Sequence, residues 1–307
     1  MTRKTPLLGV AAALTCAAAL TPAISTATAH QSEPTVRAPM NNLISLHAMP
    51  RGSAQFFYGL GGDLSVKLSV TGVTPGSEHS VDLERTTCPA SSRPDANLAE
   101  PATVQADATG RINQTIDLGQ FAQPFAHGPL ALTLRQGVIT GDASQLARQG
   151  IACTRVPRPV EFRSMRAHMS RGIRSTLTPV SESGNPLWGW ASYAYNANDP
   201  MSKTGQSVTV TIRASGFVPG SVHAAHIHSG TCASQGGVVV MLPDLTADSR
   251  GHLSATDTVP VTQQPQGPLY INLHEGDSNT ILDANGNPTL AFRPLLCGNV
   301  STENASR

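Results

Sequence analysis

Charge and aromatic side chains are scarce in this sequence: 13% of its residues are charged, 4% are aromatic, and the formal net charge is +1. So small a net charge provides no broad field for a polyanion or a membrane surface, and nucleic acid binding is not expected. Beyond the N-terminal region, no segment reaches the ~18 uninterrupted apolar residues of a membrane span. The 27 glycines and 23 prolines lie among short Val, Thr, Ser and Leu runs, which favours many brief strands. The sequence therefore predicts an all-β protein.

The N-terminus has the three parts of an export signal. Arg3 and Lys4 precede the apolar stretch 7–20, and the small residues 27–29 form a cleavage site. We expect residues 1–29 to be a signal peptide and the mature protein to be secreted and extracellular. Cys16 would be removed with the signal.

The four remaining cysteines indicate a duplication. Cys88 and Cys153 are as far apart in the sequence as Cys232 and Cys297. An even number of cysteines in an oxidising compartment predicts disulfides. The equal spacing predicts one disulfide within each of two related units.

The residues around the cysteines repeat as well. The segment Thr74–His79 corresponds to Val218–His223, and Ala106–Gly110 corresponds to Ala247–Gly251. Period-two alternation predicts about seven or eight short strands in each unit, which is typical of a Greek-key β-sandwich or barrel. The fold prediction is therefore two tandem β-sandwich domains.

These observations place the first domain at 30–153 and the second at 175–307. The segment between them, 154–174, is rich in arginine and reads as a linker. Two interpretations stay open: a solvated basic connector, or a contact with an anionic polymer of the cell surface.

The second domain contains the pattern His-x-His. Alternate residues of a strand project to one face, so His226 and His228 point the same way. Neutral imidazole binds copper and zinc well, and His274, at the end of another strand-like run, is the candidate third ligand. The alternative is a pair of histidines on a solvated strand edge.

This pattern resembles the extracellular Cu/Zn superoxide dismutases. There, too, a structural histidine stands before two copper ligands with the spacing of His223, His226 and His228. A cysteine after them pairs with one in a Cys-Gly context near the C-terminus, as Cys232 and Cys297 would. A further ligand stands before a glutamate, as His274 does.

The resemblance implies a specific site. His226, His228 and His274 would bind one copper ion per chain, with His223 as a supporting residue. The copper would cycle between Cu(II) and Cu(I) while dismutating superoxide. The family's guiding arginine corresponds to Arg293, which is displaced by one residue here, and cationic steering can raise on-rates ~10- to 1,000-fold.

The zinc half of that family's site is missing. Only residues 233–237 separate Cys232 from the next strand-like run, so the loop that carries the zinc ligands is absent and no zinc is expected. The sequence is thus more similar to the copper-only branch.

A second resemblance is to the CHRD domain, which shares the sandwich. It is carried by residues 224–228, 237–240 and 270–274. Three functions therefore stay open: a copper-dependent superoxide dismutase, a non-catalytic extracellular copper binder, and a structural or interaction protein without bound metal.

The first domain has lost the three imidazoles. When it is aligned with the second domain, the positions of His226, His228 and His274 hold Asp82, Glu84 and Arg135. We expect these three side chains to form a compact charged cluster. The first domain would then be a structural pseudo-domain.

Overall fold

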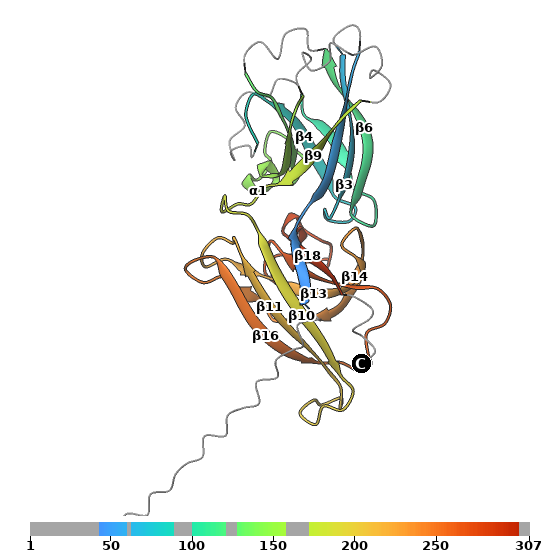
Figure 1. The fold of residues 1–307 in the computed structure, drawn as a ribbon, viewed down its shortest axis with the longest axis vertical. Coiled ribbons are helices and arrows are strands. Elements are labelled where there is room, and N and C mark those ends of the chain that lie inside the picture. Colours follow the sequence, from blue (N-terminus) through green and yellow to red (C-terminus); the bar gives the residue numbers. More distant parts are fainter. Residues whose placement is uncertain (1–42, 60–62, 89–99, 121–127, 158–171, 301–307) are drawn as a thin grey trace, which may run out of the picture. The chain divides into compact units, whose positions relative to one another are not determined.

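The computed structural model describes residues 43–59, 63–88, 100–120, 128–157 and 172–300. The predicted signal peptide and residues 158–171 of the predicted linker lie outside this part of the chain. The described residues are almost entirely β-structure, as the sequence predicts (Figure 1). Among them, no helix has the length and apolar character that a membrane crossing needs.

The first sheet has eight strands in the order β5-β4-β7-β8-β9-β2-β3-β6. Its strands are β2 (Arg51–Tyr58), β3 (Asp63–Thr71), β4 (Glu78–Glu84), β5 (Ala102–Gln105), β6 (Arg111–Gln120), β7 (Ala131–Arg135), β8 (Gly150–Arg155) and β9 (Ile173–Pro179). The sheet surrounds a core that includes Phe56, Leu68 and Leu132. The short helix α1 (Gln145–Arg148) precedes β8.

The second sheet also has eight strands, in the order β14-β13-β17-β18-β1-β10-β11-β16. Its strands are β1 (Leu43–Ala48), β10 (Trp188–Asn196), β11 (Ser207–Ser215), β13 (Ala225–Thr231), β14 (Ser234–Met241), β16 (His252–Pro260), β17 (Leu269–His274) and β18 (Pro294–Val300). A separate pair joins β12 (Val222–His223) to β15 (Leu245–Thr246), and the 3-10 turn η5 spans Leu290–Phe292.

Strand β11 illustrates how the sequence produces this architecture. Val208, Val210 and Ile212 alternate along it and lie buried in the core. The intervening Thr209 and Thr211 face outward, where their hydroxyls bond to threonines of β16. β-Branched residues that alternate with polar ones fit a sheet with one buried face.

The two sheets exchange strands. Strand β1, from the start of the described chain, lies between β18 and β10 of the second sheet and pairs with both. Strand β9, whose first two residues Ile173 and Arg174 belong to the predicted linker, lies between β8 and β2 of the first sheet. Pairing therefore crosses between the two predicted domains at β1 and β9.

Both predicted disulfides are present. Cys88 is bonded to Cys153 and Cys232 to Cys297. Each bond closes a loop of the same length, and closure of a loop this long stabilises by about 3–5 kcal/mol in the chain-entropy model.

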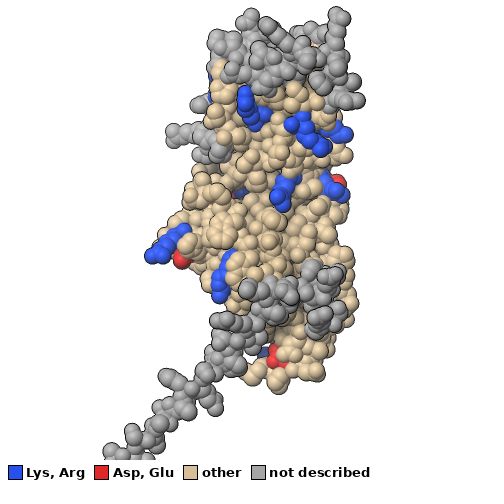
Figure 2. All heavy atoms as spheres, viewed as in Figure 1, with Lys and Arg blue, Asp and Glu red and all other residues tan. Residues whose placement is uncertain are grey.

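The charged side chains are spread thinly over the surface. On the face shown in Figure 2, Lys and Arg side chains, some with an Asp or Glu beside them, are scattered over a mainly uncharged background. This distribution agrees with the low charged content of the sequence.

Candidate metal centre

The three histidines come from two adjacent strands of the second sheet. Ile227 points into the core, so its neighbours His226 and His228 project from the opposite face of β13, as the sequence predicts. Strand β13 pairs with β17, where His226 lies opposite Asn272 and His228 opposite Tyr270. His274 ends β17 on this same face.

The rings converge at one place. Candidate ligand atoms of His226, His228 and His274 all lie within 4.8 Å of one another. The ring centroids are 5.0 Å apart for the pair His226 and His274 and 5.6 Å apart for each pair that includes His228. All three residues are at most 1% exposed. This burial excludes the alternative in which His226 and His228 are a pair of histidines on a solvated strand edge.

Hydrogen bonds to carbonyl oxygens determine which ring nitrogens are available. His228 donates from Nδ1 to the oxygen of Gly236 at 3.1 Å, and His274 donates from Nδ1 to the oxygen of Phe292 at 2.6 Å. A carbonyl only accepts, so each of these rings carries its lone pair on Nε2.

The third nitrogen is Nδ1 of His226, which lies 3.2 Å from Nε2 of His274. Two ligands on one ion, at metal–nitrogen distances of about 2.0–2.1 Å and a tetrahedral angle, are about 3.3–3.4 Å apart. The observed separation is close to this value. The ligand set that the geometry favours is therefore Nδ1 of His226 with Nε2 of His228 and of His274.

Buried ring nitrogens of the triad are available to bind an ion. Nε2 of His226 and Nε2 of His228 are buried and have no hydrogen-bond partner within the described part of the chain. Buried polar atoms are normally bonded, and a metal ion held by this ligand set would satisfy Nε2 of His228. These residues thus fit a metal ion in the number, chemistry and separation of their donors.

The electrostatics also favour ligand chemistry. Burial lowers the pKa of His228 to about 4 and that of His274 to about 3. Burial likewise lowers the pKa of His226, while the carboxylate of Asp244 acts in the opposite direction. The imidazoles are therefore neutral at pH 7, which is the form that binds metal.

Two aromatic residues enclose the triad, and sequence reasoning assigned neither of them to the site. Tyr270 stacks on His228 with centroids 4.9 Å apart and is fully buried. Phe292 lies 4.4 Å from the ring of His274 and 6.4 Å from that of His228. The alternation of β17 puts Tyr270 on the same face as His274, whereas Phe292 lies in the short turn η5, which carries no periodic signal.

His223 lies behind the triad. Its Nδ1 bonds to the backbone oxygen of His274 at 2.9 Å, and its Nε2 lies 2.6 Å from the hydroxyl of Ser221. In the first sheet, His79 makes the matching bonds to the oxygen of Arg135 and the hydroxyl of Ser77. This shared bonding pattern indicates a scaffold role for the position, with or without the triad.

Arg293 is buried and paired. Its Nε donates to Glu275 at 3.0 Å, its side chain is 1% exposed, and Gln136 bonds to the same carboxylate. The structure thus brings Arg293 to Glu275, and the guiding role assigned by resemblance stays a prediction.

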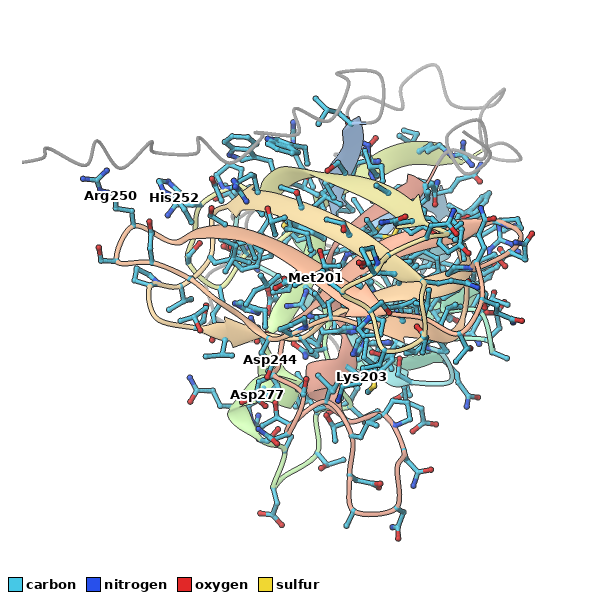
Figure 3. The ribbon with its side chains drawn as sticks, turned by 90° about the horizontal axis from the view of Figure 1, so that it is seen from below. Met201, Lys203, Asp244, Arg250, His252 and Asp277 are labelled. Carbon is cyan, nitrogen blue, oxygen red and sulfur yellow. A yellow bond between two sulfur atoms is a disulfide. The ribbon has the colours of Figure 1, made fainter. Side chains whose placement is uncertain are left out.

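An acidic residue that sequence reasoning missed lies near the triad. Asp244 is exposed and accepts bonds from the backbone N–H and the hydroxyl of Ser278. Figure 3 shows Asp244 and Asp277 beside each other on neighbouring loops. The charged side chain that acts on the pKa of His226 is thus the negative carboxylate of Asp244.

The predicted charged cluster of the first sheet is confirmed. Arg135 donates from Nε to Asp82 at 2.6 Å and from Nη2 to Glu84. The hydroxyl of Thr133 also donates to Glu84. All of these residues are at most 1% exposed, and Asp82, Glu84 and Arg135 stand at the positions that correspond to the three histidines.

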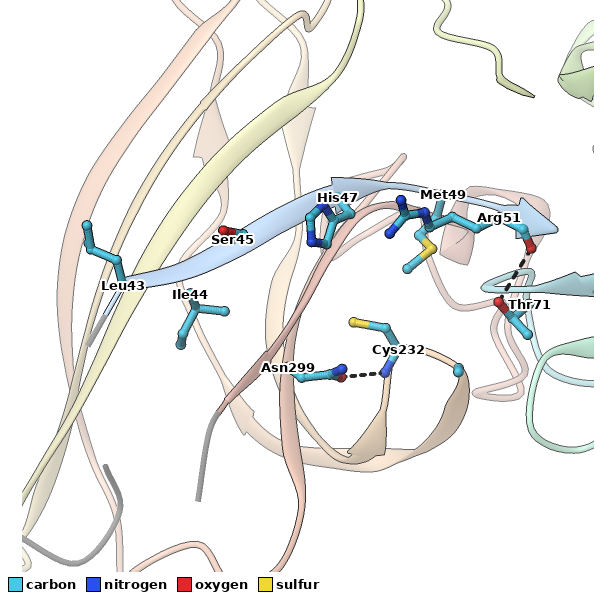
Figure 4. Close-up of a pocket in the computed structure, with 10 residues that line it drawn as sticks. Leu43, Ile44, Ser45, His47, Met49, Arg51, Thr71, Cys232 and Asn299 are labelled. Atoms are coloured by element: carbon cyan, nitrogen blue, oxygen red, sulfur yellow. Dashed lines mark hydrogen bonds between the residues drawn. The ribbon is translucent and has the colours of Figure 1, made fainter. Parts of the chain in front are cut away.

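A separate cavity of about 390 Å³ lies beside β1. Ser45, His47 and Met49 of this part of the chain line it together with Cys232 and Asn299 (Figure 4). None of the three triad histidines lines it, so its volume is no part of the candidate metal site.

Comparison with known families decides between the two resemblances only in part. Residues 174–280 match the family model of the CHRD domain. A search of curated proteins finds no match. The CHRD match includes all three histidines and Cys232 and ends before Cys297, and it gives the superoxide dismutase resemblance no further support.

Proposed function

We propose that the protein is a secreted, non-catalytic copper-binding protein with a structural or interaction role outside the cell. The observation that carries this proposal is the convergence of three neutral, buried imidazoles whose candidate ligand atoms lie within 4.8 Å of one another. The CHRD match supports an extracellular structural role, and the two disulfides suit an oxidising compartment.

Copper is proposed on the chemistry of the donors and on the resemblance. An all-imidazole site suits copper or zinc, and copper binds more tightly than zinc in the general order of divalent metals. A bound ion would cross-link β13 to β17, and binding to the folded state alone would stabilise it.

Dismutation of superoxide is less well supported. A dismutase needs an open coordination position and a positive approach path. Here the triad is enclosed by Tyr270 and Phe292, Arg293 is paired with Glu275, and the nearby charge belongs to Asp244.

The test is metal loading of the purified mature protein, followed by measurement of bound metal and of superoxide dismutation, with His228→Ala as the control. We expect one copper ion per wild-type chain, no activity above that of the buffer, and loss of the bound ion in the variant. Dismutation that requires His228 would establish the enzyme instead. Equal and weak loading of both proteins would leave only the structural role.

A further inference from the structure

Phe292 is bonded to one ligand of the triad, and its ring lies against two of them. Its backbone oxygen accepts the Nδ1 proton of His274 at 2.6 Å, so the residue is tied to a ligand. Its ring lies against His274 and His228. Unlike Tyr270, which is fully buried, Phe292 retains some solvent exposure. Phe292 therefore lies between two of the ligands and the solvent.

The residue is held there by the turn η5. The hydroxyl of Thr289 caps this turn by accepting the N–H of Ala291 at 3.1 Å, and the N–H of Phe292 bonds to the oxygen of Thr289. The next residue, Arg293, is fixed by Glu275. Interactions of the residues before and after Phe292 in the chain thus fix the position of its ring.

Enclosure has a consequence for the oxidation state of a copper ion. Cu(II) prefers tetragonal coordination with four or more ligands, whereas Cu(I) is stable with three. Burial of a doubly charged ion also costs about four times as much as burial of a singly charged ion of the same size. The triad offers three neutral ligands, so no ligand charge offsets this cost.

One exposed methionine lies on the same face of the sheet as the triad. Met241 of the edge strand β14 lies opposite His226 in the pairing of β14 with β13, and directly opposed residues share a face. It is 62% exposed, which is unusual for a large apolar side chain.

We propose that Phe292 closes the three-histidine site so that it holds copper as Cu(I) and leaves no coordination position for water or another small ligand. This inference rests on the proposed function. It assigns to Phe292 the role of a specificity-determining residue that does not itself bind the ion.

For the test, the full mature chain is loaded with Cu(I) in the absence of oxygen. Competition with the chelator bicinchoninate measures its affinity for Cu(I). The sample is then exposed to air, and electron paramagnetic resonance measures the fraction of Cu(II). We expect wild type to stay almost silent and Phe292→Ala to develop a Cu(II) signal. We also expect the variant to show a ratio of Cu(I) to Cu(II) affinity that is lower by about tenfold or more.

Phe292→Leu is the matched control, because it keeps an apolar side chain over the ligands, and it should behave as wild type. Added azide should produce a copper absorption band in Phe292→Ala only. Wild-type copper that oxidises as completely as copper in Phe292→Ala would overturn the inference and leave the proposed function standing. Absence of bound copper in both oxidation states would overturn the proposed function and this inference with it.

Discussion

Arg135 and Asp82 are joined by a 2.6 Å contact between adjacent strands of the first sheet. In the second sheet, His274 and His226 meet at the corresponding place through ring nitrogens 3.2 Å apart. The registers agree as well, since Asp82 faces Thr133 as His226 faces Asn272. One scaffold thus carries a candidate metal centre in one copy and an ion-pair cluster in the other.

Removal of the cation from the first cluster should destabilise the protein strongly. Arg135→Met leaves the carboxylates of Asp82 and Glu84 buried without their counter-charge, and we expect a loss of about 3–5 kcal/mol in the free energy of unfolding. Urea denaturation measures this. Arg111→Met, at an exposed position of β6, is the control and should change stability by about 0.5 kcal/mol or less. Equal effects of the two substitutions would contradict a structural role for the cluster.

The first site should accept metal when its imidazoles are restored. Because the registers match, the triple variant Asp82→His, Glu84→His and Arg135→His should bind a second copper ion, as measured by elemental analysis and calorimetry. Arg135→His alone should bind only one ion. A wild-type protein that already binds two ions tightly would contradict the assignment of the first sheet as a metal-free scaffold.

Acid should weaken the metal-free protein in a defined window. The pKa of His79 and that of His228 are lowered by burial from 6.5 to about 4, so below pH 6.5 the unfolded chain takes up protons that the folded protein does not. Above about pH 6.5 these two histidines do not reduce the free energy of unfolding. As the pH falls from 6.5 towards 4, proton uptake by the unfolded chain lowers the free energy of unfolding by a few kcal/mol in total. Urea midpoints at pH 7, 5.5 and 4.5 in the presence of a chelator measure the loss. Midpoints that do not change across this range would argue against neutral buried histidines.

The exchanged strands should hold the two halves together after the chain is cut. We expect a protein with a specific protease site inserted within residues 158–171 to remain one particle in gel filtration after cleavage, because β1 and β9 each lie inside the sheet of the other half. Denaturant should be needed to separate the fragments. Separation of the two fragments in native buffer would show that these pairings are weak.

The local features of this protein could be predicted from its sequence. Alternation in residues such as Val208, Val210 and Ile212 predicted strands, and the spacing of four cysteines predicted both disulfides. The convergence of His226 and His228 with His274 followed from the two-residue period of a strand and from one neighbouring strand. The charged cluster followed from the alignment of the two repeats.

The features that were not predicted depend on contacts between distant segments. In a duplicated chain the strands of the two copies are similar, so sequence pattern alone does not determine in which sheet β1 or β9 lies. Phe292 is in the short turn η5, and its position depends on the bond from His274 and on the pair between Arg293 and Glu275. The fold class is thus encoded locally, whereas the enclosure of the site is not.

The exchange of β1 and β9 also bears on how this gene could have evolved. Once each copy had contributed an inner strand to its sibling, neither could be deleted without opening a gap in the survivor. The first copy can therefore carry Asp82, Glu84 and Arg135 at the positions of the three histidines and still be required to complete the sheet of the second copy.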